Sequence, residues 1–554
     1  MTNPSPARRH DARPFRSGAV LACAALALLC SACSLRLLER PETQEPAESA
    51  VTDAPAAAET TAGAAGTAEA ASTTATSGAT GTTGTAATTE AAVPPTTVRD
   101  CSPRASAGEI ALDTADAVTL SFDISRTLYE CADEVGLALA WSPEAIVSLA
   151  GHDLRGPLLL IESWSSADLM AEIERLAPER IVTAGFSEQI LERRLPGFAI
   201  ERVPVDPQTT LPLSDVTYER VWIVAGAEHA AVLGALVQPL GGAAVAAHAD
   251  MRALAPAERE MLRSAVHVEV QAELEPEAAW QLEVVRRGAE LPGGGLLIFD
   301  RDRTRRIVAM YGHPSTSQLG VLGEQGPSEG VARLRSIAEG YDADGADVVL
   351  AFEIIATVAS AQAGRDGDYS NETALDDIRP WIETAAANDM YVVLDLQPGR
   401  TDFLTQAKQY EELLRLPHVG LALDPEWRLK PGQVHLRQIG TVDAAEINEV
   451  VRWLAELVRT EALPQKLLVL HQFRFSMITN RELIETPPEL AVLIHMDGQG
   501  PINTKYSTWD ALTGEPDADR FWWGWKNFYD EDSPTPTASQ VLARTPLPLF
   551  VSYQ

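Results

Sequence analysis

The sequence contains little basic charge, and that shortage narrows the range of partners. Among 554 residues, 78 acidic side chains outnumber 44 basic ones, which gives a formal net charge of −34. A nucleic-acid backbone is bound by clustered basic residues, and an anionic lipid surface attracts the same kind of cluster. The sequence also lacks the G-x-G-x-x-G and P-loop patterns of nucleotide-binding proteins. We therefore expect no nucleic acid, no nucleotide and no electrostatic membrane docking.

The acidic residues are concentrated in one part of the chain. Residues 1–40 carry a net charge of +4 and residues 41–98 a net charge of −7, which leaves −31 for residues 99–554. Apolar residues make up 45% of the chain, enough to build a buried core. The acidity is therefore a property of the region that we expect to fold.

The N-terminus has the pattern of a secretory signal. Arginines within residues 8–16 precede an apolar run over residues 18–30, and small residues follow that run. The run is too short to span a membrane comfortably. The segment Leu29–Cys33 resembles a bacterial lipobox, which implies that Cys33 becomes lipidated. We expect residues 1–33 to be a lipoprotein signal peptide, with an ordinary signal peptide as the alternative. The protein would then be anchored in a cell membrane by lipid and face the cell wall.

Aromatic residues are absent from residues 41–98, and lysine and arginine are absent there too. Such a segment cannot bury enough apolar surface to offset its conformational entropy. We predict that residues 34–100 form a disordered linker rich in alanine and threonine. After the signal segment only Cys101 and Cys131 remain, and in an oxidising compartment these two either pair or stay separate thiols.

Residues 101–299 show strands that alternate with helices, which is typical of a parallel, doubly wound α/β domain. Helical patterns cover residues 166–176, where Ser166 is placed to cap the helix, and residues 229–238. The expected strands are 157–161, 180–185, 220–226 and 243–247.

The sequence pattern of this region resembles a known module. The segments Gly156–Leu160 and Leu176–Gly185 are similar to the two strands of the type 2 cell-wall-binding repeat of Gram-positive surface proteins. A second unit over residues 218–290 is more degenerate, because Gly242–Val245 replaces the Pro-Leu-Leu strand. The resemblance implies that residues 101–299 bind a cell-wall polysaccharide or glycan.

Three consecutive glycines, Gly293–Gly295, and a charged run over residues 300–306 mark a domain boundary. Beyond it, eight strand candidates are mostly separated by helical patterns, as in a (β/α)8 TIM-type barrel over residues 304–554. The candidates are 307–311, 348–354, 391–396, 419–423, 467–470, 490–495, 521–528 and 549–552.

In such barrels the active site lies at the carboxyl ends of the strands. Ionisable residues follow seven of the predicted strands, and aromatic residues accompany them. The candidate catalytic residues are Glu353, Asp395, Asp424, Glu426 and Asp497. The candidate substrate-binding residues are His313, Trp427, His471, Gln472, His495, Trp523, Trp525, Lys526 and Tyr529.

The pair Asp424 and Glu426 is the sharpest candidate among these residues. Positions two residues apart in an extended segment point to the same side. Burial and like charge would raise the pKa of Glu426, so that it could act as a general acid on a glycosidic bond. The pair resembles the fourth-strand D-x-E of family 18 chitinases and family 25 lysozymes. That resemblance implies Glu426 as acid/base and Asp424 as its electrostatic partner, although Pro425 departs from the pattern.

Two other functions remain open at this stage. Histidines 313, 471 and 495 could hold a divalent metal with nearby carboxylates, as in metal-dependent hydrolases. The usual H-x-H of the first strand is missing, so we expect neither a metal nor a cofactor. The barrel could also be a non-catalytic, wall-binding scaffold. The leading expectation is a surface lipoprotein with a glycoside-hydrolase-like barrel that acts on or binds wall polysaccharide.

Overall fold

The computed structural model describes residues 100–554, except residues 107–115, 153, 165–166, 212–216, 301–303 and 436. The predicted signal peptide with Cys33, and nearly all of the predicted linker, lie outside the described residues, as does the predicted cap Ser166. Among the residues that are described, no helix has both the length and the apolar character needed to cross a membrane.

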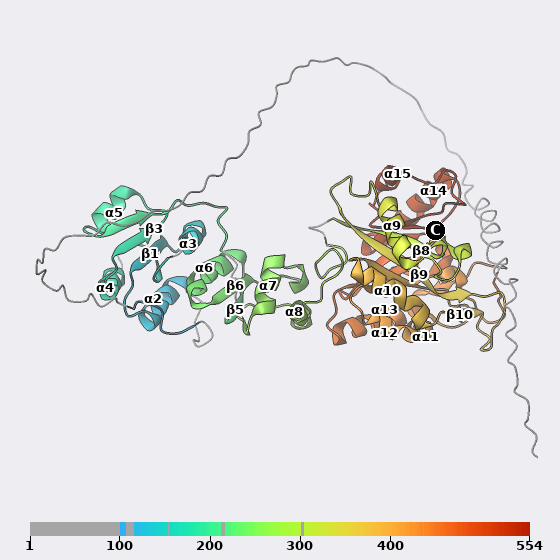
Figure 1. Cartoon of the computed structure of the whole chain (residues 1–554), viewed down its shortest axis with the longest axis horizontal. Coiled ribbons are helices and arrows are strands. Elements are labelled where there is room, and N and C mark those ends of the chain that lie inside the picture. Colours follow the sequence, from blue (N-terminus) through green and yellow to red (C-terminus); the bar gives the residue numbers. More distant parts are fainter. Residues whose placement is uncertain are drawn as a thin grey trace, which may run out of the picture. The chain divides into compact units, whose positions relative to one another are not determined.

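The first folded region is a parallel four-stranded sheet with helices between its strands (Figure 1). Its strand order is β2-β1-β3-β4, so the chain winds outward in both directions from the central pair β1 and β3. The strands are β1 (Glu134–Leu139), β2 (Leu158–Ile161), β3 (Arg180–Thr183) and β4 (Ala199–Arg202). The helices are α2 (Ala117–Leu128), α3 (Pro143–Ala150), α4 (Ala167–Leu176) and α5 (Glu188–Arg194). Cys101 and Cys131, which precede α2 and β1 respectively, form a disulfide with Cα atoms 5.1 Å apart.

A second, smaller parallel sheet follows in the order β6-β5-β7. The predicted α/β region therefore contains two sheets, each wound outward from a central strand. The strands are β5 (Arg220–Val224), β6 (Gly242–Ala246) and β7 (His267–Val270), and the helices are α6 (Ala227–Val237), α7 (Pro256–Ser264) and α8 (Ala278–Arg287).

The C-terminal region is a closed barrel of parallel strands, which confirms the predicted (β/α)8 class. The last strand pairs with the first, and the first pairs with the second, so the barrel has no open edge. The strands are β8 (Arg305–Gly312), β9 (Asp347–Ala359), β11 (Tyr391–Leu396), β12 (Val419–Leu423), β14 (Lys466–His471), β16 (Leu490–Met496), β17 (Trp522–Asn527) and β18 (Phe550–Tyr553). A short strand, β10 (Ser370–Glu372), extends the sheet by pairing antiparallel to the end of β9.

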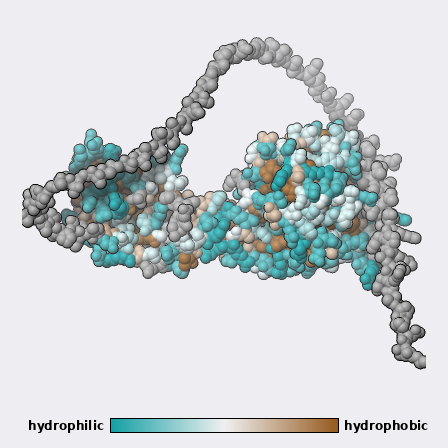
Figure 2. Space-filling view, viewed as in Figure 1, coloured by the Kyte–Doolittle hydropathy of each residue, from teal (hydrophilic) through white to brown (hydrophobic). Residues whose placement is uncertain are grey.

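Helices surround this barrel and cover its outer face (Figure 1). They are α9 (Pro327–Ile337), α10 (Leu375–Ala387), α11 (Phe403–Gln409), α12 (Glu411–Leu414), α13 (Ala444–Thr460), α14 (Ile502–Thr513) and α15 (Ala538–Leu542). The visible face of the barrel region in Figure 2 is largely teal and white, with smaller brown patches.

The lower part of the barrel lumen is packed with apolar side chains. Because side chains alternate along a strand, every second residue faces inward and forms a layer with its counterparts on other strands. Buried residues of this internal cluster are Ile307, Ala309, Val349, Ala351, Tyr391, Val393, Ala422, Leu467, Val469, Ala491, Leu493 and Phe550. Ile298 and Phe299, which precede the barrel, pack against the same cluster. The floor of the barrel is therefore closed by apolar side chains.

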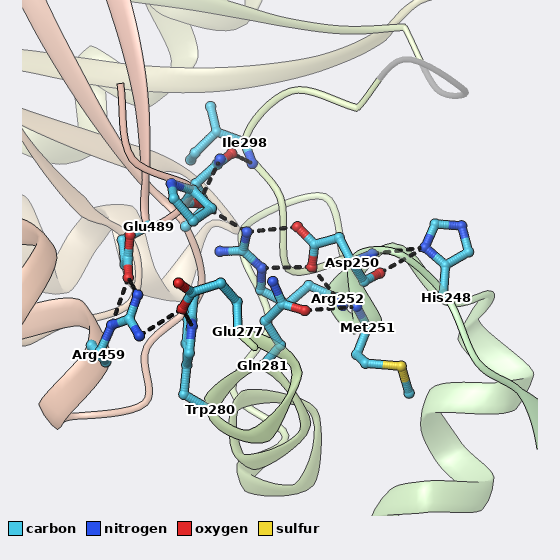
Figure 3. A network of polar contacts seen from close by, with 12 residues as sticks. His248, Asp250, Met251, Arg252, Glu277, Trp280, Gln281, Ile298, Arg459 and Glu489 are labelled. Carbon is cyan, nitrogen blue, oxygen red and sulfur yellow. Dashed lines mark hydrogen bonds and ion pairs between the residues drawn. The ribbon is translucent and has the colours of Figure 1, made fainter. Parts of the chain in front are cut away.

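Contacts also join the second α/β unit to the barrel (Figure 3). Trp280 of α8 lies between two guanidinium groups, at 4.8 Å from Arg252 and 5.1 Å from Arg459. Arg459 comes from the end of α13 and forms an ion pair with Glu277 at 2.6 Å. Arg252 donates a hydrogen bond to the carbonyl of Pro488 at 2.8 Å. The barrel residues in these contacts precede β14 and β16 and so belong to the end opposite the carboxyl ends of the strands.

Candidate functional site

A polar layer lies directly above the apolar layers of the lumen. Continuing the two-residue alternation upward gives one polar side chain from each barrel strand, and every one of them is at most 3% exposed. The layer consists of Tyr311, Glu353, Asp395, Asp424, His471, His495, Lys526 and Ser552. Strand register places Tyr311 beside Glu353 and His471 beside His495. The sequence alternation itself therefore brings these ionisable groups together.

His471 stands at the centre of this layer. Its Nε2 lies 3.1 Å from Oε1 of Glu353, and its Nδ1 lies 3.1 Å from Oδ2 of Asp497. Asp395 is 3.8 Å from the same Nε2. Burial opposes the charge on His471, but the hydrogen bonds with Asp497 and Glu353 outweigh it and raise its pKa well above the ordinary value. A carboxylate thus lies at each ring nitrogen of His471, an arrangement that favours its protonated form.

Asp424 and Glu426 both follow β12, at the point where the chain leaves the extended conformation that our prediction assumed. Oδ1 of Asp424 accepts a hydrogen bond from the backbone N–H of Glu426 at 3.3 Å, in a short 3₁₀ turn over Pro425–Trp427. Burial, reinforced by the charge of Glu426, raises the pKa of Asp424 well above its usual range. Glu426 is partly exposed, yet burial of its carboxyl, reinforced by Asp497, raises its pKa to about 8. Glu426 therefore carries a proton at neutral pH.

Two further carboxyl groups of the site, those of Asp395 and Asp497, differ from each other in their pKa shifts. Burial raises the pKa of Asp395 to about 6 although His471 opposes the rise, and Tyr311 donates to its Oδ2 at 2.8 Å. Asp497 behaves in the opposite way, because its hydrogen bond with His471 overcomes burial and lowers its pKa. Lys526 adds a cation to the layer, with Nζ 3.4 Å from the centre of the Tyr311 ring. The carboxyl ends of the strands, which we call the mouth of the barrel, therefore contain both a protonated and an ionised carboxyl group. Acid and base roles require such a pair.

Trp427 is the aromatic residue that the structure keeps beside the site. Its ring lies edge-on to His435 at 5.3 Å, and its Nε1 is buried without a hydrogen-bond partner. Nε2 of His435 lies 3.1 Å from the carbonyl of Tyr369, and Arg400 covers the Tyr369 ring at 4.3 Å. The loops after β9, β11 and β12 are thus packed together next to Glu426.

The structure places Trp523 and Trp525 away from the mouth, unlike our prediction of substrate contact. They are 3% and 0% exposed and pack on Trp509 of α14 at 5.7 and 5.6 Å. The reason is alternation, since Gly524 and Lys526 occupy the lumen-facing positions of β17. Trp523 and Trp525, which alternate with these positions, must then face the helices.

Three other predicted residues make contacts of a structural kind. His313 has its Nε2 3.0 Å from Oγ1 of Thr373, and Tyr529, at 41% exposed, stacks on Tyr553 at 5.4 Å. Gln472 accepts a hydrogen bond from Arg481 at 2.9 Å. These side chains are engaged beside the polar layer and do not form part of it.

Tyr311 and Ser552 belong to the layer although sequence reasoning missed them. Ser552 hydrogen-bonds with Nε2 of His495 at 2.8 Å. Both could have been found by counting in steps of two, from Ile307 to Tyr311 and from Phe550 to Ser552, rather than by searching for polar residues beyond each strand.

A metal ion has a conceivable donor set in this layer. Ligand atoms of Glu353, His471 and His495 lie within 4.8 Å of one another. In the arrangement described, however, Nε2 of His471 makes a hydrogen bond with Glu353, and that of His495 makes one with Ser552. The Lys526 ammonium group occupies the same layer. The donors therefore fit a hydrogen-bonded cluster better than a metal centre.

The fold and this layer define the chain as a protein with a TIM-type barrel and an ionisable site at the carboxyl ends of the strands. No model of a known protein family matches the sequence, and no curated protein matches it significantly. The likeness to cell-wall-binding repeats consequently gains no support from these comparisons.

Proposed function

We propose that the barrel is a glycoside hydrolase of the cell surface, with Glu426 as its general acid. The observation that carries the proposal is Glu426, a partly exposed residue next to the buried polar layer, whose carboxyl is itself buried and has its pKa raised to about 8. Cleavage of a glycosidic bond needs a proton for the leaving oxygen and negative charge near the anomeric carbon. The mouth supplies both.

The net charge of the folded region favours a particular kind of sugar. Residues 99–554 carry −31, although the raised pKa values of Asp424 and Glu426 reduce the negative charge at the site itself. Phosphate-rich or uronic polymers would be repelled by such an acidic protein, whereas neutral or amino sugars would not. We propose cell-wall glycan of this kind as the substrate.

The location in the cell is part of the same proposal. The lipobox-like segment ending in Cys33 would attach the protein to the outer face of a membrane. The disulfide between Cys101 and Cys131 supports an oxidising compartment, because such bonds rarely persist in a reducing cytoplasm. Replacing Cys33 by Ser should release the protein from the membrane fraction. Unchanged fractionation of C33S would exclude lipid attachment at this residue.

The activity is tested with purified protein lacking residues 1–33 on peptidoglycan and chitin oligosaccharides. We expect Glu426→Gln to lower turnover by roughly 10²–10⁴-fold, the usual contribution of a general acid. Glu482→Gln is the matched control, because Glu482 is exposed on a turn outside the site. Wild-type turnover should fall as pH rises through about 8, where Glu426 loses its proton.

Full activity in E426Q would exclude Glu426 as the acid. No turnover in the wild type would favour the second candidate, a non-catalytic barrel that binds wall glycan, and sedimentation with isolated walls would then test for binding. Metal-dependent hydrolysis is supported only by the closeness of Glu353, His471 and His495. It requires stoichiometric metal in the active protein, which elemental analysis measures.

A further inference from the structure

We infer that Asp497 is the second catalytic carboxylate of this site, and that His471 is the positioning residue that holds it in place. The inference rests on the proposed glycosidase function and assigns the group that faces the anomeric carbon. It also removes His471 from the predicted substrate-binding set.

Position along the strands separates Asp497 from the other carboxylates. Asp497 comes two residues after His495, and Glu426 comes two residues after Asp424. Asp497 therefore lies one step beyond the buried polar layer, and Glu426 lies in the 3₁₀ turn that follows Asp424. Glu353 and Asp395 belong to the layer beneath and are 0% exposed, whereas Asp497 is 7% exposed and Glu426 more than that.

The two oxygens of Asp497 have different surroundings. Oδ2 is held by Nδ1 of His471 at 3.1 Å, while Oδ1 is buried and has no hydrogen-bond partner, as is also true of Oε2 of Glu353 and Oδ1 of Asp395 in the layer beneath. A buried carboxylate oxygen without a partner is unfavourable unless another group uses it. A positively charged anomeric carbon is such a group.

The His471 ring is fixed from several sides. Its second nitrogen is held by Glu353 at 3.1 Å, and the rings of Tyr311 and His495 lie edge-on to it at 6.1 and 5.1 Å. The ring is 0% exposed, so it acts on the substrate only through Asp497. This arrangement fixes both the orientation and the negative charge of Asp497.

The electrostatics of the two outer carboxyls agree with this division of roles. Burial and the charge of Asp497 keep Glu426 protonated, while His471 keeps Asp497 ionised. Environments that separate the pKa values of two neighbouring carboxyls mark one as the acid and the other as the anion.

The proposed reaction is a proton transfer from Glu426, cleavage of the C1–O bond and addition of water at C1. Glu426 gives its proton to the glycosidic oxygen, and the electrons of the C1–O bond leave with that oxygen. The Asp497 carboxylate faces the positive charge that develops at C1. Water supplies a hydroxyl to C1, and its proton restores Glu426.

The first test removes the Asp497 carboxylate. Asp497→Ala should lower kcat by roughly 10²-fold or more with little change in KM, because the lost interaction exists only in the transition state. Added azide should restore part of the turnover by acting at C1 and give a glycosyl azide. Asp530→Asn is the control, because Asp530 is exposed and lies outside the site.

The second test examines the positioning role of His471 by a measurement that does not depend on enzymatic turnover. In ¹⁵N NMR of selectively labelled protein, His471 should remain doubly protonated at pH 8 in the wild type, and Asp497→Asn should lower its pKa. His471→Gln should shift the acidic limb of the kcat/KM profile to higher pH, because Asp497 loses its cation, while KM changes little. A neutral His471 at pH 8, or an unshifted limb in H471Q, would overturn the positioning role.

The outcomes separate this inference from the proposed function. An active wild type with D497A turnover within threefold of it overturns the role of Asp497 alone. An inert wild type overturns the glycosidase proposal together with the catalytic role of Asp497, while the NMR measurement still decides whether His471 holds Asp497.

Discussion

The buried pair Lys505 and Asp532 supports the strand that carries Lys526, and breaking it should destabilise the barrel strongly. Nζ of Lys505, on α14, lies 2.6 Å from Oδ2 of Asp532 and donates to the carbonyl of Lys526 at 2.7 Å. Both side chains of the ion pair are 0% exposed. Asp532 also accepts hydrogen bonds from the backbone N–H groups of Gly500 and Phe528, at 3.0 and 2.9 Å.

Lys505→Met preserves most of the side-chain volume and removes the charge. Asp532 is then a buried carboxylate without a cation, which costs roughly 3–5 kcal/mol. In a domain of this size about 1 kcal/mol corresponds to a shift in Tm of about 2–4 °C. We therefore expect the barrel transition of K505M to fall by roughly 6–20 °C in differential scanning calorimetry.

The double variant shows whether charge is the cause. Lys505→Met with Asp532→Asn leaves no buried charge, and its amide oxygen can still accept a backbone hydrogen bond. It should be more stable than K505M alone, with a coupling energy of at least about 2 kcal/mol. Additive losses would refute the reasoning, and so would a K505M transition within about 2 °C of the wild type, because a shift that small corresponds to about 1 kcal/mol or less.

Two further predictions concern stability. Burial lowers the pKa of Lys466 from 10.5 to about 7, and the unfolded chain therefore binds more protons than the folded one between these pH values. The contribution of Lys466 to the free energy of unfolding should therefore rise with pH across that window. In urea denaturation, the free energy of unfolding of Lys466→Met should increase less between about pH 7 and pH 10 than that of the wild type. The disulfide between Cys101 and Cys131 closes a separation of 30 residues. Replacing both cysteines by Ala should cost about 3 kcal/mol in the first α/β region, and an unchanged first transition in calorimetry would contradict this.

The sequence patterns predicted the barrel well because its strands are short apolar runs between helices. All eight predicted runs correspond to strands of the closed sheet. The division of the earlier region into two sheets was not predicted, because hydrophobic periodicity shows where a strand lies and not which strands share hydrogen bonds.

The site was predicted only in part. Glu426 and Asp424 were found because they stand directly after a strand, and His471 and Asp497 were found in the same way. Trp523 and Trp525 were misplaced, because a cluster of aromatic residues does not reveal which of them faces inward.

The sequence by itself determined the class of fold and most of the ionisable residues at the strand ends, although not Tyr311. These follow from local rules, namely the two-residue alternation of strands and the position of polar residues at strand ends. The tertiary structure decided which carboxyl is protonated and which is ionised. Asp497 and His471 meet only when β14 and β16 pair, and Glu353 reaches the same ring from β9 across the barrel. Protonation depends on burial and on such neighbours, and neither exists before the barrel closes.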